Sequence, residues 1–265
     1  MYRKHFGLTR LPFTNGIDTE ALFPSNGLRE IQVRLTHLVE LRGIGIVTGE
    51  SGSGKTTASR NVVAGLHTGL HRVLYVCLTT GNVMDMYKTI AWELGLPIER
   101  NRAALFRQIR TEVSRLCGEA RQKPILIVDE AHHLRSDVLE DLRLLTNYAM
   151  DSDNRLCLVL IGHPELRRRL NMAVHEALSQ RIIVRAHMTG LARDEIRPYL
   201  QHLLRLAGSE LELFELAAQE ALFQASSGLP RKLNLLCHHA LMAAALTRAK
   251  AVTAEHVQAA LAEAT

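Results

Sequence analysis

Short apolar runs alternate with longer amphipathic stretches between residues 43 and 184. The apolar runs, which predict β-strands, occupy residues 43–48, 72–78, 125–128, 156–161 and 182–184. The stretches with helical spacing occupy residues 56–66, 83–94, 103–117 and 138–150. Strands that alternate with helices in this way predict a parallel sheet with right-handed crossovers. The uninterrupted run Ile125–Val128 is typical of a strand that is buried on both faces.

The pattern changes after Thr189, where strand-like runs stop. The helical stretches beyond it occupy residues 194–207, 215–227, 231–248 and 254–264. Breaks at Gly208 and at Gly228-Leu229-Pro230 separate them, and Thr253 is a suitable N-cap for the last. We therefore predict three parts, namely an amino-terminal arm over residues 1–42, an α/β core over 43–190 and an all-helical domain over 191–265.

The composition is that of an ordinary globular protein. Apolar residues make up 47% of the 265 residues and charged residues 22%, which suffices for a core and excludes disorder as the main state. No apolar run approaches the ~18–20 residues needed to cross a bilayer. The first six residues also lack the apolar region of a secretory signal. We expect a cytoplasmic protein without a membrane partner.

The net charge and the Cys and His residues exclude few functions. The 32 Lys and Arg residues against 27 Asp and Glu give a net charge of +5, which permits a polyanionic partner without requiring one. The four Cys residues are widely separated, so neither a disulfide framework nor a zinc site is predicted. The pairs His132-His133 and His238-His239 have no acidic or cysteine partner at metal-ligand spacing, and we expect ordinary helix residues there.

The segment after the first strand is the first indication of chemistry. It fits the phosphate-loop pattern G-x-x-x-x-G-K-[ST] without a mismatch, as Gly49-Glu50-Ser51-Gly52-Ser53-Gly54-Lys55-Thr56. Its glycines let backbone N–H groups approach phosphate oxygens, and the following helix adds the positive end of its dipole. We expect Lys55 to contact the β- and γ-phosphates of ATP and the Thr56 hydroxyl to bind Mg²⁺. Thr57 is a further candidate nucleotide contact.

Asp129 and Glu130 follow the buried strand Ile125–Val128. An acidic pair at the end of such a strand is costly unless a cation or hydrogen bonds compensate for it. We expect Asp129 to hold Mg²⁺ together with Thr56, and Glu130 to orient and deprotonate the attacking water. The strand over residues 72–78 lies between the two motifs in sequence. This order implies a strand inserted between the two nucleotide-binding strands and favours an ATP hydrolase over a kinase.

With these motifs the sequence resembles the AAA+ ATPases, and among them the bacterial group of ExeA-type secretion ATPases and TnsC, TniB and MuB type transposition regulators. The resemblance covers essentially the whole chain. Besides the phosphate loop it is carried by Tyr2-x-x-His5-Phe6-Gly7-Leu8 with Pro12-Phe13, Val128-Asp129-Glu130-Ala131-His132, Leu144-Leu145-Thr146-Asn147, Leu160–Leu166, Leu178–Ile182 and Gly228–Asn234. It implies an α/β fold, in which a P-loop AAA+ core with a parallel β-sheet flanked by helices is followed by a C-terminal all-helical lid domain.

The resemblance also implies roles for single residues. Arg181 matches the arginine finger, which one subunit contributes to the γ-phosphate bound by its neighbour, and a surface arginine is the alternative. Arg231 matches the sensor-2 arginine of the helical domain, with a helix-cap arginine as the alternative. His163 occupies the sensor-1 position, where the family more commonly has Asn, Thr or Ser, and a loop histidine is the alternative. Asn147 is a candidate for contact with Glu130 or the γ-phosphate.

In the transposition regulators of this group, DNA contacts come mainly from the segment between the second strand and the acidic pair. That segment holds here Thr79, Thr80, Lys88, Arg100, Arg102 and Arg107. We expect Lys88 and Arg102 to contact backbone phosphates of double-stranded DNA, with Thr79 and Arg100 as further contacts. A solvated helix face is the alternative, and Arg167–Arg169 is a rival basic patch. No base-reading signature occurs, so the binding is expected to be independent of DNA sequence.

The resemblance leaves three functions open. The first is an ATPase whose homo-oligomer, a ring or helical filament, assembles on DNA when ATP is bound, recruits a transposase with a targeting adaptor, and so regulates transposition. The second is an ExeA-type secretion ATPase. Those relatives continue into a membrane span and a wall-binding domain, and their absence from this sequence counts against it unless the sequence is a fragment. The third is a nucleotide-gated replication loader or scaffold.

Overall fold

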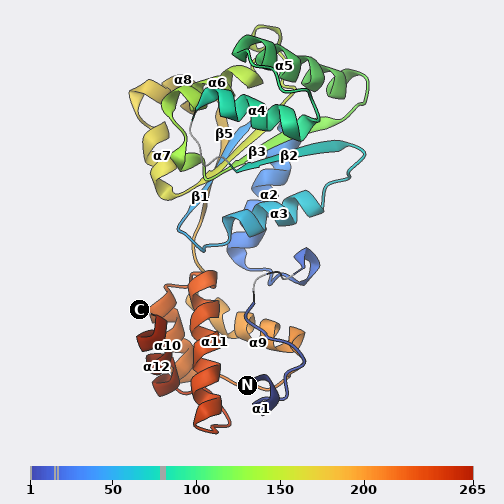
Figure 1. Ribbon diagram of the computed structural model, residues 1–265. Helices are drawn as coiled ribbons and strands as arrows, with labels where there is room; N and C mark the ends of the chain where they lie inside the picture. The colour runs from blue at the N-terminus through green and yellow to red at the C-terminus, as the bar shows by residue number, and fades with distance from the viewer. Residues whose placement is uncertain (1, 15, 17, 78–81, 265) are drawn as a thin grey trace. The chain divides into compact units, whose positions relative to one another are not determined.

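A computed structural model describes residues 2–14, 16, 18–77 and 82–264 of the chain (Figure 1). These residues form two compact units. The sheet unit comprises Glu30–Gly49 and Lys55–Met188. The helical unit comprises the residues up to Arg29, the segment Glu50–Gly54 and the residues from Thr189 onward.

Five parallel strands form the sheet within the described residues, in the spatial order β2-β3-β4-β1-β5. They are β1 (Ile44–Gly49), β2 (His71–Cys77), β3 (Lys123–Asp129), β4 (Cys157–Gly162) and β5 (Ile182–Met188). Every residue of β1 and β4 is buried, as continuous apolar runs require in a sheet that is covered on both faces. Because the strands are parallel, all of their carboxyl ends meet at one edge, the carboxyl edge, and their starts meet at the opposite amino edge.

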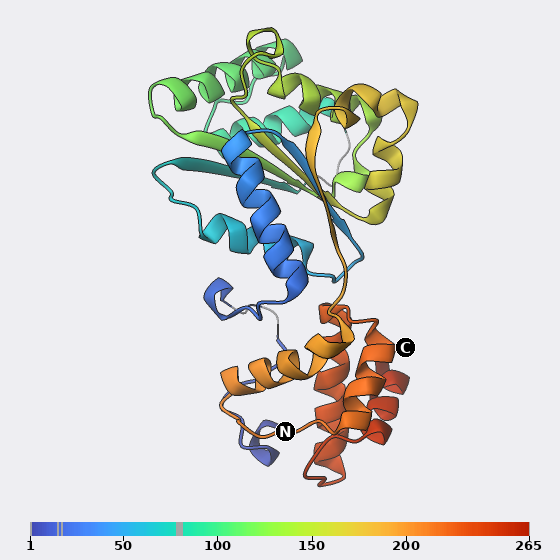
Figure 2. The same ribbon diagram turned by 180° about the vertical axis from the view of Figure 1, so that it is seen from behind.

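Helices cover both faces of the sheet, with α2 and α3 on one face and α4, α5 and α6 on the other (Figures 1 and 2). The bounds are α2 (Asn26–Leu41), α3 (Lys55–Ala64), α4 (Val83–Leu94), α5 (Arg102–Gly118), α6 (Ser136–Thr146), α7 (Pro164–Leu170) and α8 (Glu176–Ser179), with 3₁₀ turns at Ala131–His133, Ala149–Asp151 and Ala173–His175. α2 packs closely on β1, because a Cβ atom at Gly45 would lie 2.3 Å from Cδ2 of Leu38. Glycine at this position therefore lets the Leu38 side chain pack directly against the strand.

Polar caps fix the ends of α4 and α5. The Asn82 side chain accepts the N–H of Asp85 at 2.8 Å at the start of α4, and Asn101 accepts the N–H of Ala103 at 2.8 Å at the start of α5. α4 ends at Gly95, whose φ of 76° lies in the left-handed region that glycine favours at helix ends. These caps set the bounds of two helices that the sequence pattern predicts at residues 83–94 and 103–117.

The two strands that end at the nucleotide-binding motifs are β1 and β3, and β4 lies between them. The expectation that β2 lies between them is wrong. β2 lies at the edge of the sheet beside β3. Its burial alternates, with Arg72, Tyr75 and Cys77 exposed, as is usual for an edge strand, whereas β4 is buried throughout. A fully apolar strand loses more contact with water in the middle of the sheet, and this favours β4 there.

The helical unit contains the carboxyl-terminal helices and the first residues of the chain. Its elements are α1 (Tyr2–His5), α9 (Ile196–Leu206), α10 (Leu216–Ser226), α11 (Pro230–Leu246) and α12 (Ala254–Ala264), with 3₁₀ turns at Thr19–Ala21 and Arg193–Glu195. Tyr2, Phe6 and Phe13 are buried in its core, and the Tyr2 hydroxyl lies 3.0 Å from Nδ1 of His238. The beginning of the predicted arm therefore packs inside this unit.

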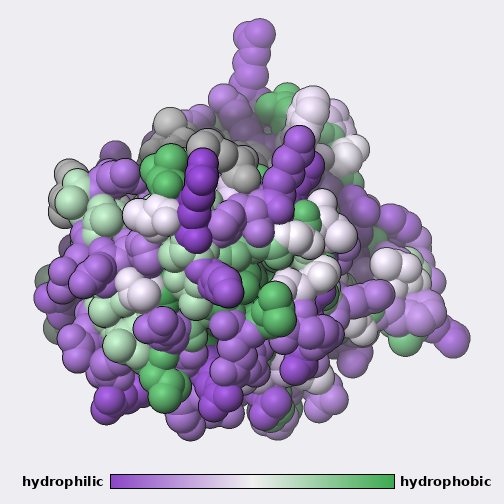
Figure 3. Space-filling model, turned by 90° about the horizontal axis from the view of Figure 1, so that it is seen from below, coloured by the Kyte–Doolittle hydropathy of each residue, from purple (hydrophilic) through white to green (hydrophobic). Residues whose placement is uncertain are grey.

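The predicted fold class is confirmed, since an α/β core with a helix-flanked parallel sheet is accompanied by a helical carboxyl-terminal region. The hydrophobic pattern does not predict α2, which falls within the expected arm. In the described ranges, none of the helices combines the length and the apolar character that crossing a bilayer requires. The face drawn in Figure 3 carries mostly hydrophilic side chains with small apolar patches between them, as is normal for a protein surface.

Candidate nucleotide-binding site

The carboxylate of Asp129 is the centre of the candidate site. Asp129 ends β3 at the carboxyl edge of the sheet and is 4% exposed. The hydroxyls of Thr56 and Tyr75 each donate to its Oδ2 at 2.8 Å, and the backbone N–H of Glu130 donates to its Oδ1 at 2.8 Å. Thr56 and Asp129 are 73 residues apart in sequence, and the structure brings them together in the arrangement that the two motifs predict.

Tyr75 belongs to the site although sequence reasoning did not identify it. The register of β2 with β3 places Cys77 opposite Asp129, so Tyr75 lies two residues earlier on the same face of the edge strand. Burial and the hydrogen bond to Asp129 raise the pKa of Tyr75, and its hydroxyl therefore remains a donor. The only sequence signal is an aromatic hydroxyl in an apolar run, and it has meaning only once β3 is known to be the neighbour of β2.

The phosphate loop adopts the backbone that its glycines allow. Gly52 has a φ of 78° and Gly54 a φ of 99°, both in the left-handed region. Lys55 is buried, and its Nζ donates to the carbonyl oxygen of Gly49 at 2.8 Å. Oγ of Ser53 is buried without a hydrogen-bond partner. An unpartnered buried hydroxyl is costly, and a phosphate oxygen bound in the loop would satisfy it.

Arg231 contacts the phosphate loop within the helical unit, to which Glu50–Gly54 belong. Its backbone N–H donates to the carbonyl oxygen of Gly52 at 3.3 Å, and Nη1 donates to Oγ of Ser51 at 3.4 Å. A Cβ atom at Gly52 would lie 2.7 Å from Cβ of Arg231, so this contact itself requires glycine. The structure thus joins the predicted sensor-2 arginine to the loop, and its role in catalysis stays a prediction.

The residues of the sheet unit fit a magnesium ion with a triphosphate. Mg²⁺ prefers oxygen ligands, and the Thr56 hydroxyl and the Asp129 carboxylate offer two within hydrogen-bonding distance of each other. When bound, the ion would supply positive charge that polarises the phosphates. Two other predicted nucleotide contacts flank these groups in sequence. The Glu50 carbonyl accepts the N–H of Ser53 at 3.2 Å, and Thr57 is half-buried in the first turn of α3.

Glu130 follows Asp129 in an uncommon backbone conformation. Its φ of 55° and ψ of 32° are left-handed, which is rare for a residue with a side chain and is found often at functional sites. The chain turns there out of β3 and into the 3₁₀ turn Ala131–His133. The Glu130 side chain is 44% exposed, so its carboxylate lies beside a buried aspartate and remains accessible to water.

Three imidazole rings gather at this turn. The ring of His132 lies 3.9 Å from that of His133 and 4.4 Å from that of His163, between ring centroids. Burial and the neighbouring His133 and His163 rings lower the pKa of His132, so its imidazole is neutral at pH 7. The predicted sensor-1 residue thus lies against the turn that carries Glu130. Its contact with water or phosphate stays a prediction.

The expectation that the His132-His133 pair has no acidic partner at metal-ligand spacing is wrong. One donor atom from each of Glu130, His132 and His133 lies within 4.8 Å of the other two. The reason is the left-handed conformation of Glu130, which folds its side chain back toward the two residues that follow. A spacing rule that assumes a helix does not anticipate such a turn.

Asn147 lies away from Glu130. The chain returns through α6 from the end of β3 to the start of β4, and Asn147 caps the far end of this 11-residue helix, about 16 Å along its axis. Its carbonyl oxygen accepts a hydrogen bond from Arg110. The structure, in which both residues are described, therefore does not bring Asn147 to Glu130, and we remove it from the candidate catalytic residues.

Arg181 immediately precedes β5 and so lies at the amino edge of the sheet. It donates to Oδ2 of Asp151 at 2.5 Å, and its side chain is 24% exposed. Asp129 of the same chain is at the opposite edge. This location is unsuited to contact with the chain's own nucleotide and agrees with the predicted contact with the nucleotide of a neighbour.

The predicted DNA contacts lie on α4, on α5 and in the loop between them, except Thr79, which falls outside the described residues together with Thr80. Arg100 is exposed, and Lys88 is half-buried one helical turn before Trp92, which is 74% exposed. A groove of about 590 Å³ is lined by Tyr87, Arg100, Asn101, Arg102, Ala103, Phe106, Asp141 and Leu144. The contacts with DNA themselves stay predictions.

Arg102 already has a partner within the chain. Its Nε donates to Oδ2 of Asp141 at 3.0 Å, and its Nη2 donates to Oδ1 at 2.5 Å and to Oδ2 at 2.7 Å. Asp141 lies on α6 and is 3% exposed, so the arginine compensates a buried charge. Arg169 of the rival basic patch is similarly engaged, because it donates to the carbonyl oxygens of His132 and Leu134.

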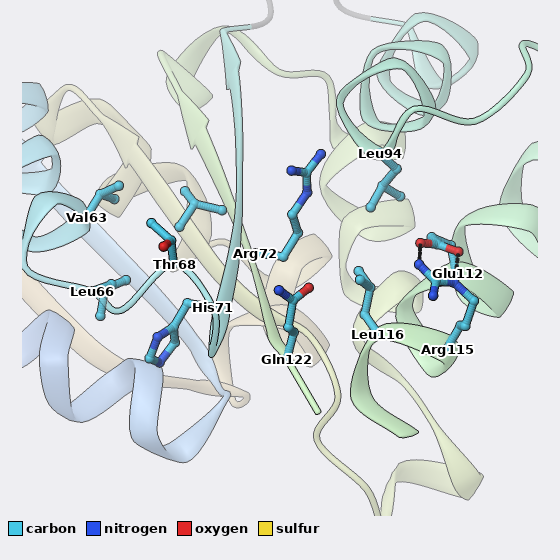
Figure 4. Close-up of a pocket in the computed structure, with 11 residues that line it drawn as sticks. Val63, Leu66, Thr68, His71, Arg72, Leu94, Glu112, Arg115, Leu116 and Gln122 are labelled. Atoms are coloured by element: carbon cyan, nitrogen blue, oxygen red, sulfur yellow. Dashed lines mark hydrogen bonds and ion pairs between the residues drawn. The ribbon is translucent and has the colours of Figure 1, made fainter. Parts of the chain in front are cut away.

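A separate cavity of about 490 Å³ lies between the end of α3, the start of β2 and α5 (Figure 4). It is lined by Val63, Leu66, Thr68, His71, Arg72, Val73, Leu94, Glu112, Arg115, Leu116 and Gln122. The ion pair of Glu112 and Arg115 on α5, at 2.7 Å, forms one side of it. Since β2 begins at His71, this cavity lies toward the amino edge, and none of its lining residues belongs to the predicted nucleotide site.

A known protein family matches the part of the chain that carries the candidate site. A family described as the AAA domain matches residues 38–170, which include the phosphate loop, Asp129 and Glu130. Cdc6p of Pyrobaculum aerophilum has a similar solved structure, with a TM-score of 0.67 and 18% sequence identity over 93% of this chain and 71% of that one. At this identity the structural likeness concerns the fold alone.

Two curated relatives differ in the process that they serve. General secretion pathway protein A of Aeromonas hydrophila is 35% identical over 92% of this chain and 45% of its own length. The ATP-dependent target DNA activator B of Escherichia phage Mu is 28% identical over 81% of this chain and 62% of its own length. The chain thus spans about half of each relative. The resemblance to the group of secretion ATPases and transposition regulators is confirmed.

We expect the Arg102→Ala substitution to lower the free energy of unfolding by about 1–2 kcal/mol, because the buried Asp141 carboxylate loses its charged donor. The expected loss of unfolding free energy is modest because the Arg102 side chain is 60% exposed and water can take its place beside Asp141. Urea unfolding of the full chain measures this change. Arg100→Ala is the matched control and should change stability by less than about 0.5 kcal/mol. Equal stability of the two variants would contradict the structural role of Arg102.

Proposed function

Because this chain belongs to the AAA family of ATPases, we propose that it is a Mg²⁺-dependent ATP hydrolase that assembles on double-stranded DNA and regulates transposition. The contact of Thr56 with Asp129, with Glu130 directly beyond it, is the observation that carries the hydrolase part. The DNA part is supported by the exposed basic residues around α4 and α5 and by the similarity to a phage target DNA activator.

Nucleotide binding would use groups that are already oriented. The backbone of the phosphate loop and the unpartnered Ser53 hydroxyl would receive phosphate oxygens. Lys55 would exchange its hydrogen bond with the Gly49 carbonyl for the β- and γ-phosphates, which carry more negative charge. Thr56 and Asp129 would hold the magnesium ion. The buried position of Lys55 strengthens its attraction to phosphate because little water screens it.

Glu130 would act as the general base. It lies next to Asp129 in sequence, its side chain is partly exposed, and its strained backbone fixes the direction of that side chain. A carboxylate in this position accepts the proton of the attacking water while the γ-phosphate leaves ADP. His163, whose ring lies 4.4 Å from that of His132 at the same turn, would orient the water.

Hydrolysis would require a neighbouring subunit. Arg181 at the amino edge would supply its guanidinium to the γ-phosphate of the next subunit, where the developing charge is greatest. To do so it must leave Asp151, which now accepts its hydrogen bond. An oligomer, as a ring or a helical filament, would thus couple ATP hydrolysis to assembly.

DNA would bind along α4 and α5. Arg100 is exposed and Lys88 is half-buried, and we prefer these two because Arg102, although exposed, must also compensate Asp141. A few phosphate contacts from one subunit bind weakly, and a homo-oligomer on the same duplex adds them through avidity. A transposase and a targeting adaptor would then recognise the assembled form.

A role in secretion is the second candidate function. It is favoured by the 35% identity to general secretion pathway protein A, which covers 92% of this chain and exceeds the identity to the phage protein. The nucleotide site would work in the same way in both processes. The two candidates therefore differ in the partner of the assembled subunits, and a test of DNA binding separates them.

We expect the Glu130→Gln substitution to reduce ATP turnover by about 10²–10⁴-fold, because the amide cannot accept the proton of water. Nucleotide affinity should be unchanged and assemblies formed with ATP should persist. Steady-state phosphate release and nucleotide titration measure the two quantities. Glu119→Gln, at an exposed position beyond α5, is the control and should keep full turnover. Unaltered turnover in Glu130→Gln would refute the assignment of the base.

We expect the double substitution of Lys88 and Arg100 by Ala to weaken ATP-dependent binding of duplex DNA at least tenfold at moderate salt. Two lost phosphate contacts should also reduce the slope of log affinity against log salt by about 0.9 each. Fluorescence of Trp92, the only tryptophan of the sequence, reports binding because it lies one turn from Lys88.

The matched control for this experiment replaces Arg205 and Lys250 by Ala, which removes the same charge from the helical unit. It should leave DNA affinity within about twofold of that of the unaltered chain. Nucleotide affinity should be the same in both double variants. If the unaltered chain shows no ATP-dependent binding to duplex DNA at low salt, the DNA part of the proposal fails and the secretion function is favoured.

A further inference from the structure

The turn that follows β3 carries a set of potential metal ligands that the proposed ATPase reaction does not need. Glu130, His132 and His133 each direct one donor atom to a common region, and these atoms lie within 4.8 Å of one another. Oε2 of Glu130 is 3.4 Å from Nδ1 of His132. Only Glu130 of the three has a place in the proposed hydrolysis.

The local backbone explains why these side chains converge. Glu130 is left-handed, and the 3₁₀ turn Ala131–His133 follows it directly. A 3₁₀ helix has three residues per turn, so the two histidines follow Glu130 within a single tight turn. The N–H of His133 donates to the carbonyl oxygen of Glu130 at 3.0 Å, which closes the turn. The ring of His132 lies beside that of His133, with 3.9 Å between the centroids.

Neighbouring groups hold the turn in place. Arg169 of α7 donates to the carbonyl oxygen of His132 at 2.5 Å and to that of Leu134 at 2.6 Å. A Cβ atom at Gly162 would lie 3.1 Å from the backbone nitrogen of His132, so the end of β4 leaves only enough room for the turn. A ligand set on a fixed backbone binds a metal more tightly than one that must first be ordered.

The donor set selects the class of metal. Two imidazoles and one carboxylate suit Zn²⁺, Co²⁺ and similar transition metals, whereas Mg²⁺ prefers oxygen ligands only. Tetrahedral zinc with bonds near 2.0–2.1 Å has ligand atoms about 3.3 Å apart. The separation of 3.4 Å between Oε2 of Glu130 and Nδ1 of His132 is close to this edge, and the exposed His133 has a donor atom within 4.8 Å of both. A metal at Nδ1 of His132 would replace the hydrogen bond that this atom accepts from the N–H of His163 at 3.4 Å. Three protein ligands leave the fourth position for water.

We propose that Glu130, His132 and His133 form a binding site for a transition-metal ion of the zinc class, and that its occupation inhibits ATP hydrolysis. The inhibitory part rests on the proposed function, because a carboxylate that binds the metal can no longer accept the proton of the attacking water. Nucleotide binding uses Lys55, Thr56 and Asp129 and should continue when the metal is bound. The metal would thus hold the chain in its ATP-bound form, and removal of the metal by a chelator would release it.

The metal site is tested first without nucleotide. Titration of the full chain with Co²⁺ should give the visible absorption of a tetrahedral complex at one ion per chain, and Zn²⁺ should displace it. His133→Ala should weaken the affinity for Co²⁺ at least tenfold. His239→Ala is the matched control, since this imidazole lies 3.1 Å from the carboxylate of Glu263, and it should bind Co²⁺ like the unaltered chain.

The inhibition is tested next, by measuring ATP turnover against free Zn²⁺ in a metal-buffered solution. The unaltered chain and His239→Ala should lose turnover at the Zn²⁺ concentration that fills the site, with nucleotide affinity unchanged. His133→Ala should have normal turnover without zinc and need at least tenfold more Zn²⁺ for inhibition. Addition of a chelator should restore turnover in each case.

The possible outcomes are distinct. Equal Co²⁺ affinity of the unaltered chain and His133→Ala would overturn the metal site. Binding of one Zn²⁺ ion without loss of turnover would overturn the inhibition, since Glu130 would then remain available to water. A chain without any ATP turnover would overturn the proposed hydrolase and with it the inhibition. The Co²⁺ titration would still decide whether the three residues bind the metal.

Discussion

The carboxylate of Asp129 is buried at the end of a strand whose preceding residues are largely apolar, and the candidate site depends on how its charge is compensated. Burial of an uncompensated carboxylate would strongly destabilise the fold. Hydroxyl groups of Thr56 and Tyr75 and the N–H of Glu130 donate to it. Since Thr56 lies in the first turn of α3, one carboxylate joins the end of the phosphate loop, the edge strand β2 and the turn that carries the proposed base. The Thr56 hydroxyl and the Asp129 carboxylate, which contact each other, are also oxygens that suit magnesium.

Contiguous motifs in the sequence predict the chemistry of the site well, and they do so because each motif is a local structure. The phosphate loop, the acidic pair and the strand–helix alternation need only neighbouring residues to be recognised. Features that depend on the spatial order of the strands cannot be predicted from these motifs. Tyr75 cannot be assigned without its neighbour β3, and β4 lies between β3 and β1 although it follows both in sequence. Asn147 is misjudged because α6 carries it away from Glu130, and the approach of His132 and His133 to Glu130 is missed because Glu130 is left-handed.

The two edges of the sheet have different tasks in the proposed mechanism. The carboxyl edge holds the groups that would bind nucleotide and activate water, and the amino edge holds Arg181. A single chain cannot bring both edges to one phosphate, so the arrangement favours a catalytic unit of two subunits. In the proposed mechanism, surfaces outside the nucleotide site would determine which partners such an assembly binds. This is consistent with the similarity of the chain to one relative that is named for secretion and to another that is named for DNA activation.

Calorimetric titration with ATP, with and without Mg²⁺, tests the central role of the Thr56–Asp129 contact most directly. The unaltered chain should bind ATP, and Mg²⁺ should increase its affinity at least tenfold. Asp129→Asn should still bind ATP through the phosphate loop but gain little from Mg²⁺, because the ion loses its charged ligand. Absence of ATP binding by the unaltered chain, or an equal gain from Mg²⁺ in both proteins, would contradict the account.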